Sequence, residues 1–148
     1  MNTLLETQLK RAKAAARLLK NMPTCTKNQA LEKIADALIA RSDEILEANK
    51  KDMAHAKEVN MTKAMQDRLL FTHERIVGVS DGVKKVATLP DPIGEVMESW
   101  TRPNGLEISK VRVPIGVFGI IYEARPNVTV DIASLCLKSG NACVLRGG

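Results

Sequence analysis

Two short polar segments in this chain could do chemistry, and each directly follows an apolar run. They are Tyr122-Glu123-Ala124-Arg125-Pro126-Asn127 and Arg146-Gly147-Gly148. Arg125 offers a planar cationic fork that suits phosphate or carboxylate groups, and Asn127 offers an amide N–H₂ that could stabilise negative charge near a helix N-terminus. Arg146 precedes two glycines, which let a backbone approach closely, so it could contact a nucleotide phosphate or ribose.

Ordinary structural roles explain the same residues. In the first segment Asn127 would cap a helix and Arg125 would pair with Glu123, and the residues alone support both interpretations about equally. In the second segment, spacing alone favours a turn that ends a strand. The chain has no P-loop and no G-x-G-x-x-G after a strand, since Gly116 and Gly119 lie inside an apolar run.

Residues around these segments predict a strand–helix–strand unit that would position them. Residues 116–122 are apolar throughout, which is typical of a strand buried on both faces of a parallel sheet. Residues 128–138 have helical spacing, with Asp131 and Lys138 expected on the exposed side. Gly140-Asn141 is expected to end this helix, with glycine at the usual C-terminal position, and residues 142–145 predict a second buried strand. Because ligands bind at the carboxyl ends of parallel strands, both polar segments are expected at one edge of the sheet.

The chain before this unit is predicted to be mostly helical. Apolar spacing and capping residues predict helices over 3–21, from Thr26, from Ser42, over 62–69 and from Thr72. Pro90-Asp91-Pro92 interrupts the helical pattern. Two strands, 95–102 and 106–113, then flank Pro103-Asn104-Gly105, where Asn-Gly predicts a tight turn with positive φ and the apolar pattern predicts a register irregularity.

Composition narrows the possible function classes. A hydrophobic content of 45% and a charged content of 26% are those of a globular domain. No apolar run is long enough to span a bilayer, and no secretory signal is present, so a cytoplasmic location is expected. Five basic residues against one acidic residue in positions 1–25 supply most of the net charge of +5, and this confinement to one helix disfavours nucleic-acid binding.

Cysteine and histidine residues show no pattern of metal binding. Cys25, Cys136 and Cys143 form no C-x-x-C, and the last two lie in apolar stretches, so buried free thiols are expected there. His55 and His73 stand alone in polar helical stretches and are expected on the surface. No metal site is predicted.

Several segments of the chain resemble the gamma-glutamyl phosphate reductases, a family of the aldehyde dehydrogenase superfamily. They are VPIGVFGIIYEARPNVTVDIASLCLKSGNACVLRGG (113–148), RPNGLEISKVRVPIGV (102–117), DPIGEV (91–96) and Asn49-Lys50-Lys51-Asp52. The resemblance implies a glutamate-5-semialdehyde dehydrogenase of proline biosynthesis, which reduces L-glutamyl 5-phosphate with NADPH and releases phosphate. It also implies a cysteine thiolate that attacks the acyl phosphate.

The same resemblance implies roles for residues of the two polar segments. The implied cofactor-binding residues are Tyr122, Glu123, Arg146, Gly147 and Gly148, and the implied catalytic or substrate contacts are Arg125 and Asn127. None of the three cysteines matches the family's nucleophile, so the catalytic domain is expected to be absent and the chain by itself is expected to be inactive.

The predicted architecture is therefore α/β and incomplete. Residues 1–90 form a helical layer, residues 91–113 form a hairpin, and residues 114–148 form the first βαβ unit of an aldehyde-dehydrogenase-like nucleotide-binding domain. The hairpin either contacts another subunit or folds onto its own domain. The alternatives are a non-catalytic α/β module that binds a nucleotide or partner subunit, a basic helical nucleic-acid binder, and a dehydrogenase of free aldehydes.

Overall fold

The computed structural model describes residues 3–147 and confirms an α/β chain with a helical region, a hairpin and a βαβ unit. The elements are α1 (Thr3–Leu19), α2 (Thr24–Ala40), α3 (Ser42–Glu58), α4 (Lys63–Leu69), α5 (His73–Thr88), β1 (Val96–Thr101), β2 (Glu107–Val111), β3 (Val117–Ile121), α6 (Pro126–Lys138) and β4 (Ala142–Arg146). Within the described residues, no helix combines the length and apolarity needed to cross a membrane.

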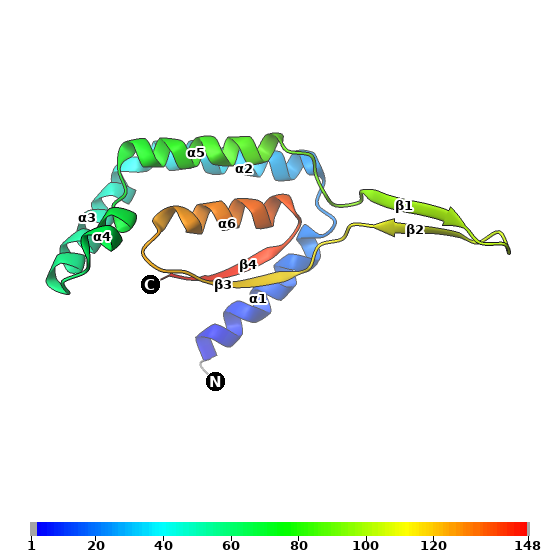
Figure 1. The fold of residues 1–148 in the computed structure, drawn as a ribbon, viewed down its shortest axis with the longest axis horizontal. Helices are drawn as coiled ribbons and strands as arrows, with labels where there is room; N and C mark the ends of the chain where they lie inside the picture. The colour runs from blue at the N-terminus through cyan, green and yellow to red at the C-terminus, as the bar shows by residue number, and fades with distance from the viewer. Residues whose placement is uncertain (1–2, 148) are drawn as a thin grey trace.

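The body of the molecule is layered. Helices α2 and α5 pack along each other, α6 lies beneath them, the two strands β3 and β4 follow, and α1 crosses the far face of that small sheet (Figure 1). Helices α3 and α4 lie at one end of the body, and the hairpin β1–β2 leaves from the other end. Helix α6 therefore links the two ends and touches both the helical layer and the sheet.

The apolar core lies between α2, α5 and α6. One buried cluster is Leu31, Ala35, Val83 and Ala87, and a second is Phe71, Ile76 and Val79. Val130 of α6 packs against both clusters, which joins the βαβ unit to the helical layer. Within this core the Ser80 hydroxyl donates to the Ala35 carbonyl over 3.0 Å, so its polar group is satisfied.

The largely buried carboxylate of Asp91 joins three parts of the chain at the root of the hairpin. Lys27 Nζ lies 2.5 Å from Asp91 Oδ2, and the Lys27 side chain is only 2% exposed. The Thr24 hydroxyl donates to the same carboxylate oxygen over 2.7 Å, and the Ile93 N–H donates to Oδ1 over 3.0 Å. Lys27 Nζ also donates to the Lys138 carbonyl over 3.2 Å, so the end of α6 is included.

Hydrogen bonding at this carboxylate changes its acidity. Burial by itself would raise the pKa of the Asp91 carboxyl. The hydrogen bonds from Lys27, Thr24 and the Ile93 N–H outweigh burial, so the pKa of Asp91 lies below its ordinary value. The Asp91 carboxylate is therefore ionised in the folded chain at neutral pH.

Lys138 is buried, and the prediction that it is exposed is wrong. Only 4% of the residue is accessible, and its Nζ donates to the Ala87 carbonyl over 2.9 Å and to Asn28 Oδ1 over 2.6 Å. The last turn of α6 lies against the end of α5 and the start of α2, and both supply acceptors. A lysine ammonium at a helix C-terminus also interacts favourably with the unpaired carbonyls there.

One predicted helix cap is confirmed and one is wrong, and the predicted start of a helix at Ser42 is confirmed. The Thr72 hydroxyl accepts from the backbone N–H three residues later, over 3.2 Å, and so caps α5. Helix α2 starts before Thr26, after Pro23, and its cap makes no side-chain hydrogen bond. Helix α3 starts at Ser42 with Arg41 as its cap residue, again without a side-chain bond, because α2 and α3 follow each other almost directly.

The predicted glycine ending of α6 is confirmed, and it also aligns the sheet. Gly140 has φ +67, its N–H donates to the Leu137 carbonyl over 3.1 Å, and the Asn141 N–H donates to the Cys136 carbonyl over 2.8 Å. This pair of bonds is a Schellman motif. The buried Asn141 Oδ1 accepts from the Gly116 N–H over 2.7 Å, which fixes the start of β3 beside the end of α6.

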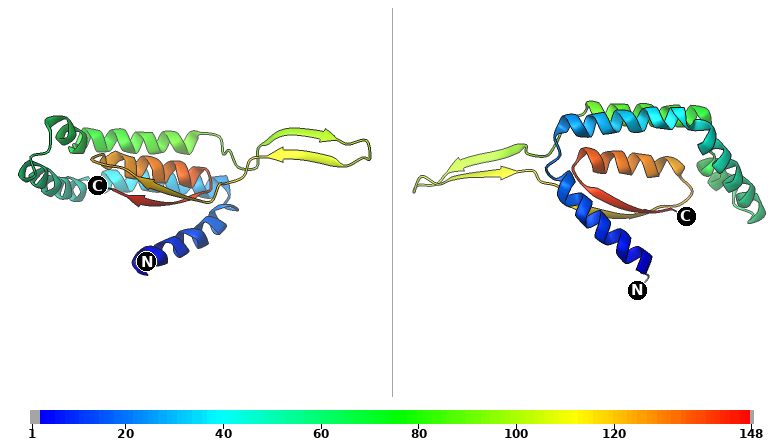
Figure 2. Two further views of the ribbon diagram at one scale, coloured as in Figure 1. Left: turned by 60° about the horizontal axis from the view of Figure 1, so that its bottom comes forward. Right: turned by 180° about the vertical axis from the view of Figure 1, so that it is seen from behind.

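The strand β3 is less buried than its apolar sequence predicts. It pairs in parallel with β4, but Ile121 is 84% exposed and Gly119 is also exposed. Within residues 3–147 this sheet has two strands, and α1 crosses its outer face obliquely (Figure 2). Burial on both faces would require more covering structure than the described residues supply.

The hairpin projects from the body in every view (Figures 1 and 2). The predicted register irregularity is present as a bulge at Met97 of β1. The turn differs from the prediction because only Gly105 has positive φ, whereas Asn104 does not. The Gly105 N–H donates to the Arg102 carbonyl over 2.9 Å, so Pro103 and Asn104 form a type I turn that Gly105 completes.

We predict that Asp91→Ala destabilises the chain by about 3–5 kcal/mol at pH 7, because it leaves the Lys27 ammonium buried without its partner. Urea unfolding followed by circular dichroism measures this. Asp36→Ala is the matched control, since its ion pair with Lys84 is exposed and such pairs contribute about 0–1 kcal/mol. Equal losses for the two variants would show that the buried pair is unimportant.

Protonation of Asp91 is expected to lower the stability of the fold at acid pH. Because the pKa of Asp91 is lowered by folding, its contribution is complete above the ordinary value of about 3.9 and is lost as pH falls through the folded value. Unfolding midpoints of the parent chain should therefore drop below about pH 4. Asp91→Asn should show a shallower drop, and a parallel pH profile would contradict the assignment.

Candidate functional site

The first polar segment forms a tight elbow between β3 and α6. Arg125 is the N-cap residue of α6 and Pro126 is its first helical residue, where the missing proline N–H costs nothing. Ala124 has φ +44, a left-handed conformation that costs an L-residue roughly 1–2 kcal/mol. The elbow therefore holds a strained backbone at the point where the chain turns from strand to helix.

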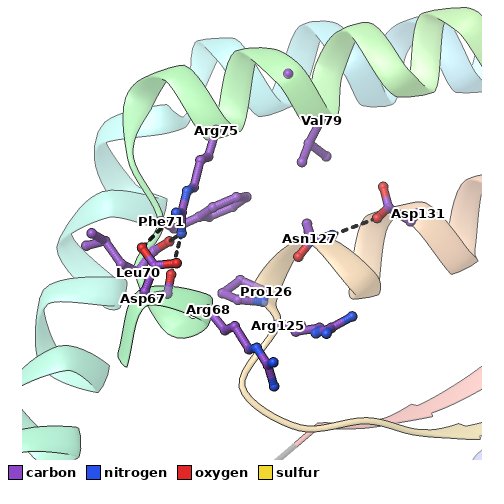
Figure 3. Close-up of a pocket in the computed structure, with 11 residues that line it drawn as sticks. Asp67, Arg68, Leu70, Phe71, Arg75, Val79, Arg125, Pro126, Asn127 and Asp131 are labelled. Atoms are coloured by element: carbon purple, nitrogen blue, oxygen red, sulfur yellow. Dashed lines mark hydrogen bonds and ion pairs between the residues drawn. The ribbon is translucent and has the colours of Figure 1, made fainter. Parts of the chain in front are cut away.

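The structural roles considered for Asn127 and Arg125 are not observed. The cap of α6 makes no side-chain hydrogen bond, and the Asn127 amide instead donates to Asp131 Oδ2 over 2.9 Å (Figure 3). No Arg125–Glu123 ion pair occurs within residues 3–147. An amide carries two N–H donors, so Asn127 keeps one for a ligand.

A cleft of about 540 Å³ separates the elbow from the helical layer (Figure 3). Its charged and polar lining comes from two parts of the chain: Asp67, Arg68 and Arg75 from the α4–α5 segment, and Arg125, Asn127 and Asp131 from the elbow and α6. The sequence prediction named Arg125 and Asn127 as site residues, and it missed Asp131 and the whole first group. No signal in the sequence links the two groups, because only packing of α6 against α5 brings them together.

One arginine of the cleft is held by hydrogen bonds within the protein. Arg75 donates from Nη1 to the Leu70 carbonyl over 2.7 Å and to the Asp67 carbonyl, and from Nη2 to Asp67 Oδ1 over 3.0 Å. These bonds close the link between α4 and α5. Arg75 is therefore a structural residue, and its charge is compensated by Asp67.

Two arginines of the cleft are not compensated. The side chains of Arg68 and Arg125 form no hydrogen bond and no ion pair with any other part of residues 3–147, and both residues line the cleft. The second carboxylate of the cleft, on Asp131, accepts from the neutral Asn127 amide and keeps its negative charge, so the lining carries one more guanidinium group than carboxylates. The cleft thus offers two open guanidinium groups, which suit an oxyanion.

Glu123 belongs to a different cleft, although only one residue separates it from Arg125. It lines a space of about 380 Å³ between α3, α4 and the elbow, together with Asp52 and His55. The structure therefore separates the acidic residue of the elbow from its arginine. Cofactor binding by Glu123 stays a prediction.

The ends of β3 and β4 meet at one edge of the sheet, as predicted. The Tyr122 N–H donates to the Arg146 carbonyl over 3.0 Å, and the Tyr122 hydroxyl forms a hydrogen bond with Thr129 of α6. The Arg146 side chain is exposed and donates to the Gly147 carbonyl. Gly148, which was predicted to bind the cofactor, lies outside the described residues.

The end of β4 presents one side chain, Arg146, that suits contact with a nucleotide. Arg146 has no carboxylate partner within residues 3–147, so its guanidinium can meet a phosphate or a ribose hydroxyl. None of the clefts described above contains Tyr122, Arg146 or Gly147. The described residues therefore offer a surface for a cofactor rather than an enclosed pocket.

The cysteines do not offer a nucleophile to the cleft. Cys136 is buried, and burial, followed by the nearby Cys143 thiol, raises the pKa of the Cys136 thiol to about 11. Cys143 is half-buried, which corrects the prediction of full burial, because the sheet is incompletely covered. Cys25 is exposed in the first turn of α2, at the end of the molecule where the hairpin leaves (Figure 1). His55 and His73 are exposed, as predicted.

Comparison with known sequences shows close relatives over the whole chain. The chain is 55% identical over 150 residues to a gamma-glutamyl phosphate reductase of Moorella thermoacetica, covering 100% of the chain and 36% of that protein. It is 57% identical over 137 residues to one of Clostridium novyi, covering 93% of the chain and 33% of that protein. No family model matches the chain.

Solved structures show the same similarity. A gamma-glutamyl phosphate reductase of Thermotoga maritima superposes with a TM-score of 0.94 at 47% identity, over 97% of this chain and 35% of that one. The enzyme of Saccharomyces cerevisiae gives a TM-score of 0.89 at 40% identity, over 94% and 35%. The chain thus spans about a third of the relatives it matches, and the predicted resemblance to an N-terminal part of these reductases is confirmed.

We predict that the cysteines differ strongly in reactivity toward iodoacetamide at pH 8. Cys25 is exposed and should react fast, whereas the buried Cys136 thiol, with its pKa near 11, should react at least about a hundredfold more slowly. Peptide mapping by mass spectrometry measures both rates. A Cys136 rate in the folded chain that equals its rate in urea would contradict the prediction.

Proposed function

We propose that this chain supplies the N-terminal part of a cytoplasmic, NADPH-dependent reductase that converts L-glutamyl 5-phosphate to L-glutamate 5-semialdehyde in proline biosynthesis. The similarity of its sequence and fold to gamma-glutamyl phosphate reductases supports the proposal. The observation that carries it in the structure is the elbow, which presents Arg125 and Asn127 to a cleft with uncompensated positive charge. A phosphorylated carboxylic acid is the kind of substrate that such a cleft attracts.

Within this proposal the elbow residues bind and polarise the substrate. Arg125 binds an anionic group and holds the acyl carbon near the start of α6. The free N–H of Asn127 donates to the carbonyl oxygen as negative charge develops on it, in a position where the N-terminus of α6 adds a favourable dipole. Asp131 orients the Asn127 amide through its hydrogen bond of 2.9 Å.

The cofactor and the nucleophile complete the proposal. NADPH would supply the hydride, and Arg146 would hold one of its phosphate or ribose groups beside Gly147 at the end of β4. We assign the attacking cysteine to the part of the relatives that this chain does not match. The reason is that Cys136 is buried with a raised pKa and Cys25 lies at the opposite end of the body.

We further propose that the hairpin is a contact between two copies of the protein. Its exposed apolar side chains are Val96, Met97, Trp100, Leu106 and Val111. Within residues 3–147 the two strands pair only with each other, so each leaves an unpaired edge. An isolated hairpin of two strands is at best marginally stable in water. A second copy would cover an unpaired edge and the face that Trp100 shares with its cross-strand partner Ile108.

A chimera tests the reductase proposal. Residues 1–148 would replace the matching third of the Moorella thermoacetica reductase, and NADPH oxidation would be followed with L-glutamyl 5-phosphate. We expect turnover by the chimera, and no turnover and weak NADPH binding by the isolated chain. A folded but inactive chimera, or activity of the isolated chain, would contradict the proposal.

Arg125→Ala in that chimera tests the elbow. We expect the KM for L-glutamyl 5-phosphate to rise at least about tenfold, which corresponds to the loss of one charged hydrogen bond. The KM for NADPH should stay the same. Arg11→Ala, on exposed α1, is the matched control, and an Arg125→Ala enzyme that behaves like this control would return Arg125 to a structural role.

Sedimentation velocity tests the hairpin contact. Trp100→Lys places a charge among the apolar side chains and should shift the chain toward monomer at about 10 μM. Thr101→Lys is the control, because neighbouring residues of a strand point to opposite faces. A parent chain that is monomeric at about 100 μM would contradict the contact.

A further inference from the structure

Arg68 is a charged residue of the cleft whose role the sequence alone does not reveal. It lies in the last turn of α4 and lines the same cleft as Arg125. The two come from different layers of the molecule, and in Figure 3 their guanidinium groups lie on the same side of Pro126. Neither group has a partner within residues 3–147, so both remain available.

The structure holds the segment that carries Arg68 in place. Helix α4 has seven residues, and a helix that short is unstable by itself in water. The buried Asn49 of α3 fixes its end, since Nδ2 donates to the Leu69 carbonyl over 2.9 Å and Oδ1 accepts from the Phe71 N–H over 2.8 Å. Arg75 closes the same link from α5. Arg68 is therefore presented from a defined backbone.

Arg68 and Arg75 sit close in sequence but differ in what they do. The Arg75 guanidinium donates hydrogen bonds to two backbone carbonyls and to the Asp67 carboxylate. Arg68 makes no such bond and adds a positive charge to a cleft that already holds Arg125. The two positive charges in this cleft repel each other. An anion with two or more oxygens offsets this repulsion, because it can accept hydrogen bonds from both guanidinium groups.

We propose that Arg68 is a substrate-binding residue that acts together with Arg125 on one oxyanionic group, a phosphate or a carboxylate. The proposal rests on the proposed function, because L-glutamyl 5-phosphate carries both kinds of group. A cation in the last turn of a helix also stabilises that helix. The test must therefore separate binding from stability.

The direct test uses the chain itself and inorganic phosphate. Phosphate is titrated at constant ionic strength while the arginine Nε–H signals are followed by NMR, and glutamate is titrated in a second arm. We expect saturable shifts of the Arg68 and Arg125 signals. The arm with the lower Kd shows which group the pair binds.

Variants of Arg68 test whether its side chain takes part in binding the oxyanion. Arg68→Gln should weaken binding at least about tenfold, Arg68→Lys should weaken it less, and Arg11→Gln on α1 should leave it unchanged. Melting temperatures measured without ligand show whether Arg68→Gln still folds, and Arg68→Lys serves if it does not. Unaltered binding in a folded Arg68 variant, or no saturable binding by the parent chain, would overturn the proposal.

The chimera separates failure of this proposal from failure of the proposed function. In an active chimera, Arg68→Gln should raise the KM for L-glutamyl 5-phosphate and leave the KM for NADPH unchanged. An unchanged substrate KM would overturn the role of Arg68 alone. An inactive chimera would overturn the reductase assignment, and the phosphate titration would still decide whether Arg68 binds oxyanions.

Discussion

The ion pair between Asp91 and the buried Lys27 is the interaction on which the arrangement of the layers depends. Asp91 pairs with Lys27 at the start of α2, and Lys27 in turn donates to the last carbonyl of α6. Lys138 at that end of α6 donates to the end of α5. Two ammonium groups thus satisfy the C-termini of two helices, and one carboxylate offsets part of their charge. The root of the hairpin follows Asp91 directly, so its position is set at the same point.

The candidate site lies at the opposite end of α6 from this polar cluster. Fixing the C-terminal end of the helix through Lys138 and the Gly140–Asn141 turn fixes the direction in which its N-terminal end points. That end carries Arg125 and Asn127, and a second, separate clamp made by Asn49 places α4 across the cleft. Two rigid attachments therefore set the distance between the walls of the cleft.

Local patterns in the sequence predicted the elements well where the cause was local. Thr72 caps α5 and Gly140 ends α6 because these roles depend on a few neighbouring backbone groups. Prediction failed where the cause was distant. Lys138 was expected in water, since nothing within its own helix reveals the acceptors on α2 and α5. The apolar β3 was expected to be covered on both faces, but covering depends on neighbours that a strand's own residues do not specify.

The sequence by itself determined the order of helices and strands, the polar elbow and the resemblance to a family of reductases. It also placed Arg125 and Asn127 at the carboxyl end of a strand, because strand and helix periods are short-range properties. Only the tertiary structure decided that Arg68 faces the same cleft, that Arg75 is neutralised by Asp67, and that Glu123 lies in another cleft. The physical reason is that charge compensation depends on distances in space, and packing between layers sets those distances.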